Sequence, residues 1–326
     1  MDLYQTSRAV RAAGVFAAAI GISLSNAAAQ EPGRTITIVV PYTAGSAPDI
    51  LARTVGEGLQ QRWSQPVVIE NKPGATGNIG TQAVARAAPD GNTLLVVANG
   101  FTANVSLLKS VPYDPVKSFA PIVMVATGSL ALVVHPSVPA SSTKQFIEYV
   151  RARPGQLNYS SPGVGGPHHL AMELLKLAAK IDIKHVPYKG GAGALQDLVG
   201  GHVSAGFQSV QVALPLVQSN QLRMLAVASK ARARLVPHVP TLLEEGLPVE
   251  VELWFGILAP AGTPPAIVDR YNKEINELIR VAQVGEKLTK QGLTMIGGTP
   301  ERFAEFIVKD VAKWRNVVKE TGIAAE

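Results

Sequence analysis

Short apolar runs alternate with longer amphipathic segments along most of the chain. From Thr35 onward the short runs are rich in β-branched residues and are bounded by glycine, proline and polar residues, which is typical of strands. Because amphipathic segments separate several of these runs, the pattern predicts βα units and a parallel sheet. The predicted strands span residues 35–42, 65–71, 93–99, 120–126, 130–136, 156–161, 183–188, 203–209 and 223–229.

The amphipathic segments repeat apolar residues at helical spacing. In residues 48–63, for example, Ile50, Leu51, Val55 and Leu59 fall on one face of a helix. The last two predicted helices follow the final strand and have no sheet of their own nearby, so we expect them to pack against the first sheet. The other predicted helices span residues 143–153, 167–180, 264–281 and 300–320.

The predicted strands form two series, one ending near Ala126 and the other starting near Leu130. This division predicts an α/β protein with two lobes and a cleft between them. Two crossing segments, at residues 126–130 and within 223–255, are expected to absorb the rotation that closes the cleft. The predicted domains are residues 129–228 and, discontinuously, residues 30–128 with 229–326.

The first 29 residues predict a signal peptide rather than part of the fold. Arg8 and Arg11 precede a 13-residue apolar run at 12–24, and small residues lead to an expected cleavage site before Gln30. At about 1.5 Å per residue, this run is too short to cross a bilayer core of about 30 Å. We therefore expect export to the periplasm without a membrane anchor.

Composition limits the kinds of site and partner. The absence of cysteine excludes disulfides, thiolate metal sites, a cysteine nucleophile and a lipid-modified cysteine at the cleavage site. Removal of residues 1–29 takes away Arg8, Arg11 and Asp2, which leaves 28 basic and 23 acidic residues and a net charge of +5. The basic residues are scattered apart from residues 230–234, so no nucleic-acid partner is expected. A mild positive charge suits a small anionic ligand, although a basic soluble surface accounts for it equally well.

The strand-to-helix turns are where a ligand site is expected, because ligands of open α/β sheets bind at the carboxyl ends of strands. In the first turn, Ser46 and Asp49 have the S-x-x-D spacing of a capping box, and Pro48 suits a first helical turn. The free backbone N–H groups there suit an anion, although an ordinary helix cap explains the same residues. The candidates are Tyr42, Thr43, Ala44, Gly45, Ser46 and Asp49.

Two later turns have a similar composition. Ser160 and Ser161 end a strand that leads through several glycines into a helix at Pro167. Glycine lets the backbone approach a ligand closely, and the helix N-terminus carries a partial positive charge of roughly half a unit. In the third turn, Tyr188 and Lys189 precede a glycine pair; Lys189 could pair with a carboxylate or could simply be solvated.

No motif for catalysis or nucleotide binding is present in the sequence. There is no phosphate loop of the form G-x-x-x-x-G-K-[ST], and the first turn lacks the second glycine of a G-x-S-x-G elbow. His168 and His169 are adjacent, so on a helix they point about 100° apart and cannot share a metal. We expect no cofactor, no metal and no catalytic residue, with a hydrolase as the weaker alternative.

Several stretches together resemble the periplasmic solute-binding receptors of tripartite tricarboxylate transporters, often called the Bug family. They are VVPYTAGSAPDILAR, VVIENKPGATGNIGTQAVARAAPDGNTLLV, NYSSPGVGGPHHLAMELL, HVPYKGGAGALQDLVGGHV and WFGILAPAGTP, and the resemblance covers nearly the whole mature chain. It implies a two-lobed, type II periplasmic-binding-protein-like fold that closes on a small organic acid. The implied partners are membrane transporter subunits.

The resemblance also implies which residues hold the ligand. The carboxylate is expected between the turn after the first strand and the glycine-rich turn of the second lobe, partly through water. By position, the residues implied are Thr43 to Ser46 and Asp49 on one side, and Ser161, Gly165, Gly166 and His168 on the other.

This chain departs from the family pattern where specificity is expected. Ser46 stands where members often have a second glycine, and Asn104 is kept but is followed by valine instead of proline. Relatives usually have acidic residues at the positions of Ser204 and Gln208, so a ligand amine loses a partner here. We therefore expect a di- or tricarboxylate or an aromatic carboxylate rather than an acidic amino acid. Phe101 could stack on an aromatic acid or could belong to the core.

These observations favour a monomeric transport receptor that is not an enzyme. Such a receptor accounts for export, two lobes and turns without catalytic groups. A ligand-sensing adaptor for a membrane kinase would share the whole fold and stays open as an alternative.

Overall fold

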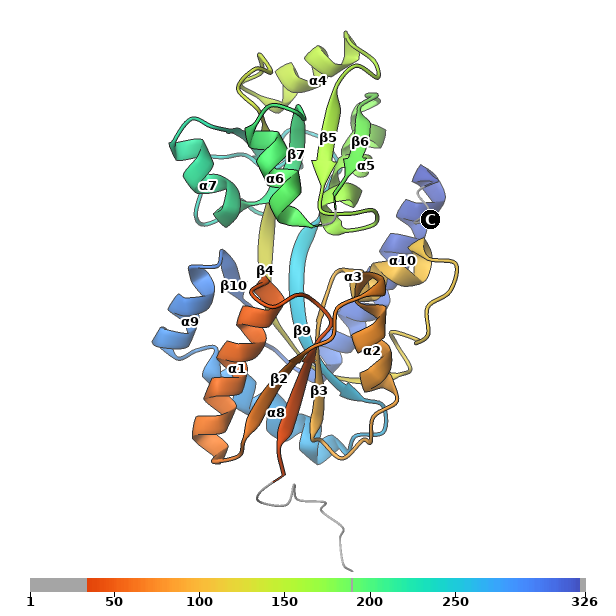
Figure 1. Cartoon of the computed structure of the whole chain (residues 1–326), viewed down its shortest axis with the longest axis vertical. Coiled ribbons are helices and arrows are strands. Elements are labelled where there is room, and N and C mark those ends of the chain that lie inside the picture. The colour runs from red at the N-terminus through yellow and green to blue at the C-terminus, as the bar shows by residue number, and fades with distance from the viewer. Residues whose placement is uncertain (1–33, 189, 323–326) are drawn as a thin grey trace, which may run out of the picture.

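The computed structural model describes residues 34–188 and 190–322, so the expected signal peptide and Lys189 lie outside the described residues. The chain forms a mixed α/β fold of two lobes (Figure 1). Two long strands, β4 (Phe119–Val134) and β9 (Glu252–Pro260), run from one lobe into the other. No described helix combines the length and the apolar character needed to span a membrane.

The first lobe is built on a parallel three-stranded unit in which β1 lies between β2 and β3. The chain returns to this lobe at its C-terminal end. Its elements are β1 (Ile36–Val40), α1 (Ala47–Trp63), β2 (Val67–Asn71), the 3₁₀ helix η1 (Ala75–Gly77), α2 (Asn78–Ala85), β3 (Thr93–Ala98), α3 (Gly100–Leu107), α8 (Pro265–Leu278), α9 (Ala282–Thr289), β10 (Leu293–Met295) and α10 (Pro300–Thr321).

The second lobe contains a parallel unit in which β5 lies between β6 and β7. Both β7 and β8 pair with the second half of β4 in antiparallel orientation. The elements are α4 (Thr143–Arg151), β5 (Asn158–Ser161), α5 (Pro167–Ala179), β6 (Lys184–Pro187), α6 (Gly191–Val199), β7 (Ala205–Ser209), α7 (Val210–Gln218) and β8 (Arg223–Val227).

The strand pairing corrects the predicted sheet in two ways. The predicted strands at 120–126 and 130–136 are one strand, β4, because its middle residues continue the ladder: Thr127 pairs with Trp254 and Gly128 with Leu253. The strands β9 and β10 were not predicted, and both are antiparallel to β4. A purely parallel sheet was therefore wrong, although the strand order β2-β1-β3-β9-β4-β7-β5-β6 keeps a parallel unit in each lobe.

The C-terminal helices pack against the first lobe, as the sequence pattern predicts. In α8, Tyr271 donates a hydrogen bond to the Gly91 carbonyl over 2.7 Å. In α10, the buried carboxylate of Asp310 accepts hydrogen bonds from Thr102 at 2.5 Å and from the indole of Trp254 at 3.2 Å. Burial raises the pKa of Asp310, although these hydrogen bonds oppose the rise. One carboxylate thus holds α10 against α3 and β9.

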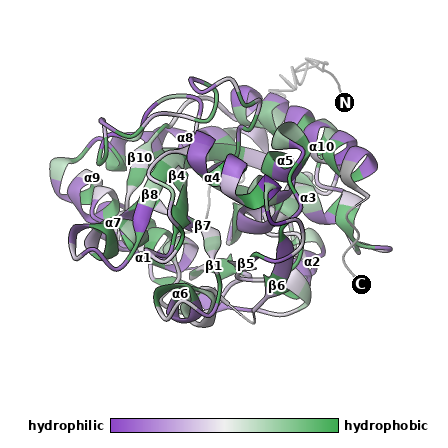
Figure 2. Cartoon of the chain, turned by 90° about the horizontal axis from the view of Figure 1, so that it is seen from above, coloured by the Kyte–Doolittle hydropathy of each residue, from purple (hydrophilic) through white to green (hydrophobic). Residues whose placement is uncertain are grey.

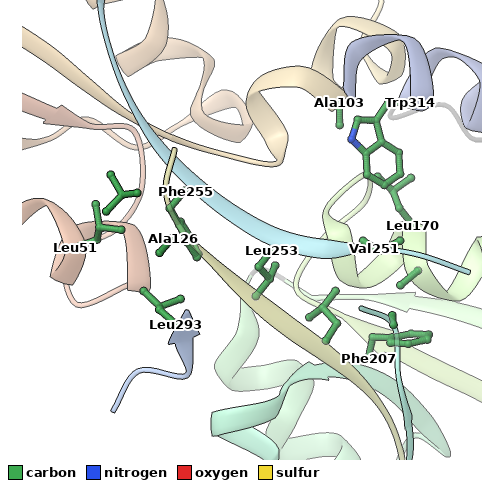
Figure 3. Close-up of a cluster of buried hydrophobic side chains, with 14 of the residues drawn as sticks. Leu51, Ala103, Ala126, Leu170, Phe207, Val251, Leu253, Phe255, Leu293 and Trp314 are labelled. Carbon is green, nitrogen blue, oxygen red and sulfur yellow. The ribbon is translucent and has the colours of Figure 1, made fainter. Parts of the chain in front are cut away.

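Apolar side chains fill the space around the crossing strands. Figure 3 shows Ala126 of β4 and Phe255 of β9 among them, and Trp314 of α10 beside Leu170 of the second lobe. The surrounding helices carry both hydrophilic and hydrophobic residues (Figure 2), as expected for elements that bury one face. The core therefore continues from one lobe into the other along β4 and β9.

Candidate functional site

A cavity of about 760 Å³ lies between the two lobes. Among the helices that the structure describes, six begin in its wall, three from each lobe. The wall includes the N-terminal or preceding residues of α1, α2, α3, α5, α6 and α7, namely Ser46, Gly77, Asn99, Gly166, Gly191 and Ser209. Each helix start directs free N–H groups and a partial positive charge outward, which favours an anion.

No lysine, arginine, aspartate or glutamate is among the described residues that line this cavity. Its one histidine, His168, is partly buried, and burial lowers its pKa to about 4. The imidazole is therefore neutral near pH 7. The described lining therefore offers an anion backbone N–H groups, hydroxyl groups and side-chain amides.

The first turn has a geometry that differs from a capping box. Ser46 is the N-cap of α1, but its hydroxyl donates to the Thr43 carbonyl over 2.6 Å instead of capping the helix. Asp49 reaches back to accept from the N–H of Gly45 over 2.8 Å. Gly45 has a φ of +80°, in the left-handed region that glycine adopts without strain. The predicted spacing thus places Asp49 correctly but assigns it the wrong partner.

Asp49 supports this turn from below the cavity. Its side chain is 2% exposed and also accepts from Arg53 over 3.0 Å and from Asn71 over 2.9 Å. Burial alone would raise the pKa of Asp49, but the hydrogen bonds from Arg53, Gly45 and Asn71 together lower it. The carboxylate is fully engaged within the protein, so it positions the turn and does not line the cavity.

The glycine-rich turn of the second lobe rests on a stack of neutral rings. The N–H of Gly165 donates to His169 Nδ1 over 3.0 Å, and the His169 ring lies 4.0 Å from that of His185. The Ser161 hydroxyl donates to the Gly163 carbonyl over 2.8 Å and lies 2.7 Å from His185 Nε2. Burial lowers the pKa of His169. Burial, and then the repulsion that a protonated His169 would exert, lowers the pKa of His185 to about 4. These groups hold the turn, while Gly166 and His168 line the cavity.

Several other predicted residues are not among the described residues that line the cavity. Ser160 is fully buried and donates to the Ala194 carbonyl over 3.0 Å. Tyr188 donates to Asp197 of α6, and burial followed by this bond raises its pKa to about 12. Ala44 is exposed and is not in the wall. Lys189 lies outside the described residues.

The structure places Phe101 in the core, although we considered a cleft position for it. The ring is 3% exposed and stacks on Tyr113 with centroids 5.5 Å apart. Asn104, which we included for its place in the family pattern, is also buried. It donates to the Thr76 carbonyl and to Asn78 Oδ1, each over 3.0 Å. Its role is to hold the turn at 74–77, where Thr76 has a φ of +57°.

The predicted residues that line the cavity are Tyr42, Thr43, Gly45, Ser46, Gly166, His168 and Gln208. The Tyr42 hydroxyl accepts from the N–H of Ala98 over 3.2 Å, and burial raises its pKa. The turn at 73–77 was not among the predicted site residues, although its PGATG sequence has the glycine-rich composition of the other turns. Asn99, Gln211 and Gln291 were not predicted either, because only the fold brings them to this wall.

No cluster of three or more histidine, aspartate or glutamate side chains suited to a metal occurs within the described part of the chain. The arrangement has the chemistry of a binding site for a small anion, with donors from both lobes.

Comparisons with known proteins agree with this geometry. A family described as "Tripartite tricarboxylate transporter family receptor" matches residues 51–323. The chain is 36% identical to Protein BugT of Bordetella pertussis, over 97% of this chain and 98% of BugT.

Two ligand-bound structures are similar throughout. The structure of Rpa4515 of R. palustris with adipate has a TM-score of 0.81 and 34% identity, covering 89% of this chain and 98% of that one. The structure of MatC from Rhodopseudomonas palustris with bound malate has a TM-score of 0.77 and 32% identity, covering 87% and 99%.

Proposed function

The chain belongs to the tripartite tricarboxylate transporter receptor family, and from this premise we propose that it is a periplasmic receptor that captures a small organic carboxylate and delivers it to a membrane transporter. The observation that carries the proposal is a cavity whose described lining includes the starts of six helices and no lysine, arginine, aspartate or glutamate. The adipate and malate bound in two similar structures support a carboxylate as the ligand class.

Capture takes place by closure of the two lobes about β4 and the segment that leads into β9. A carboxylate first meets the N-termini of one lobe, and rotation then brings those of the other lobe onto it. Closure also excludes water, which strengthens the interaction between the carboxylate and the helix ends. The protein is not an enzyme in this proposal, because a receptor needs only reversible binding.

The experiment is a thermal-shift screen of the purified protein against aliphatic dicarboxylates, citrate-like acids, aromatic carboxylates and amino acids. A ligand at 100 times its dissociation constant stabilises the folded state by about 2.7 kcal/mol, which gives a measurable shift. We expect carboxylates to raise the melting temperature.

Two variants place the binding in the cavity. Gly166→Val fills the space in front of α5, where a new Cβ meets little within the protein, and should abolish the shift. Ser46→Ala should reduce it, whereas Ser219→Ala, at an exposed site on the far end of α7, should leave it unchanged. A full carboxylate shift in Gly166→Val would refute the proposed location.

The alternative of a sensing adaptor makes the same ligand contacts and differs in its partner. Affinity capture with the ligand-loaded protein distinguishes them: recovery of transporter subunits supports transport, and recovery of a membrane kinase supports sensing.

A further inference from the structure

Among the described residues, the cavity wall carries three glutamine side chains. Gln208 is the last but one residue of β7, Gln211 lies in the first turn of α7, and Gln291 precedes β10 in the other lobe. They lie in the same wall as Leu253 and Phe255 of β9. This wall therefore combines apolar surface with neutral hydrogen-bonding groups.

Two of these amides have atoms without a hydrogen-bond partner in the described structure. Gln208 is 4% exposed, and its Nε2 is buried and unpaired. Gln211 Oε1 is likewise buried and unpaired. Buried polar groups in folded proteins are almost always paired, so an unpaired donor and an unpaired acceptor in one cavity wall indicate a missing partner.

Packing holds both side chains at this wall. Gln208 stands opposite Ala131 in the ladder between β7 and β4. Gln211 lies against Gly292, where a Cβ atom would be only 2.3 Å from Gln211 Oε1. Because α7 belongs to the second lobe and Gly292 to the first, Gln211 occupies a contact between lobes. A ligand atom that binds Gln211 therefore also affects how the two lobes are positioned relative to each other.

We propose that Gln208 and Gln211 together bind a hydroxyl group of the ligand, which makes the preferred ligands hydroxy-carboxylic acids. A hydroxyl group accepts a hydrogen bond from Gln208 Nε2 and donates one to Gln211 Oε1, so it satisfies both atoms at once. An ammonium group cannot accept from Gln208, and no described acidic residue lines the cavity to balance its charge. A methylene group leaves both amide atoms unpaired.

This proposal rests on carboxylate capture by the same cavity, so the test uses acids that share one carbon skeleton. Succinate, malate and aspartate differ at one carbon, which carries hydrogen, hydroxyl or ammonium respectively. Isothermal titration calorimetry should show malate binding at least about tenfold more tightly than succinate, and aspartate binding more weakly than succinate. A tenfold preference corresponds to about 1.4 kcal/mol at 25 °C.

Variants assign the preference to the two glutamines. Gln208→Leu and Gln211→Leu should each bring the malate-to-succinate ratio close to one while succinate binding persists, which also shows that the variant is folded. Gln208→Glu should raise the affinity for aspartate relative to malate, because it supplies a countercharge. The matched control is Gln218→Leu, at an exposed position at the end of α7, which should keep the preference.

The outcomes separate the two proposals. If succinate and malate bind equally well, or if Gln208→Leu retains the preference, the hydroxyl subsite is refuted and carboxylate capture stands. If no carboxylate binds the protein at all, both proposals fall.

Discussion

Asp49 provides a direct test of how the first turn is held. Substitution by alanine removes a 2% exposed carboxylate that accepts hydrogen bonds from Gly45, Arg53 and Asn71. The N–H of Gly45 then loses its acceptor, and Asn71 Nδ2 of β2 loses Asp49 but keeps its hydrogen bond to the Tyr42 carbonyl, over 3.2 Å. Because Asp49 does not line the cavity, any loss of ligand affinity in the variant reports the positioning of the turn.

The expected loss of stability follows from the three contacts. A hydrogen bond to a charged group contributes about 1.5–3 kcal/mol when it is shielded from water. The Arg53 side chain is 48% exposed, so water screens its pair with Asp49, and the exposed Gly45 can bind water in the variant. The loss is therefore expected to come mainly from the partly buried bond to Asn71. We expect Asp49→Ala to lower the free energy of unfolding by about 2–3 kcal/mol. At about 2–4 °C per kcal/mol, the melting temperature should fall by roughly 4–12 °C.

The assay is thermal unfolding followed by circular dichroism, with Asp49→Asn and the exposed control Asp269→Ala alongside. The pKa of Asp49 is lower in the folded than in the unfolded protein, so the ionised carboxylate stabilises the folded state. This contribution to the free energy of unfolding is complete above the ordinary carboxyl pKa of about 3.9, and it is lost as the pH falls through the folded-state pKa. The stability gap between wild type and Asp49→Asn should therefore narrow below about pH 4. A gap of under about 0.5 kcal/mol at pH 7 for Asp49→Ala, or one that stays constant to low pH, would refute this reasoning.

Three further predictions concern the other turns. Gly165→Ala should lower the melting temperature, because the new Cβ would lie 2.7 Å from Leu107 Cδ1 and φ is +77°. Because Leu107 is buried and Leu107→Ala loses stability itself, the part due to the clash is measured as the coupling in a double-mutant cycle. Asn104→Ala should lower the free energy of unfolding by about 2 kcal/mol, measured by denaturation, because it removes the hydrogen bonds that hold the turn at Thr76. It should also weaken carboxylate binding, measured by calorimetry, and unchanged binding would show that this turn does not hold the ligand. The pKa of His168 is about 4 in the folded protein and about 6.5 in the unfolded chain, so the unfolded chain takes up the proton first as the pH falls. The free energy of unfolding should therefore decrease from pH 6.5 to 4, and His168→Gln should reduce that decrease in melting curves recorded at several pH values. An identical pH profile in the variant would exclude this role of His168.

The sequence predicted those parts of the site that depend on local pattern. A strand followed by small residues and a helix start is visible in the residues themselves, so Thr43, Gly45, Ser46 and the glycine-rich turn that ends at Gly166 were predicted. The family resemblance added His168, and all of these named residues line the cavity. Asp49 was found as well, but its partner was not, because hydrogen-bond geometry within a turn depends on backbone angles that the spacing does not fix. The N–H of Gly45, at φ +80°, donates to Asp49 the hydrogen bond that the pattern assigned to the N–H of Ser46.

The missed parts depend on contacts between distant segments. The strand β9 pairs with β3 and β4, more than 120 residues earlier in the chain, and nothing in its own buried sequence reports an antiparallel partner. For the same reason, β4 was divided at Thr127 to Ser129, where small polar residues suggested a break. Gln211 was not predicted, because only the fold places it against Gly292.

The central claim is that helix N-termini, rather than charged side chains, hold a carboxylate in the cavity between the lobes. The most direct measurement is isothermal titration calorimetry of the tightest-binding carboxylate and its methyl ester at pH 5.5 and pH 8. We predict that the acid binds at least about 100-fold more tightly than the ester, and that its affinity changes little between the two pH values because the lining His168 stays neutral. Equal binding of acid and ester, or an affinity that rises steeply as the pH falls from 8 to 5.5, would contradict the claim.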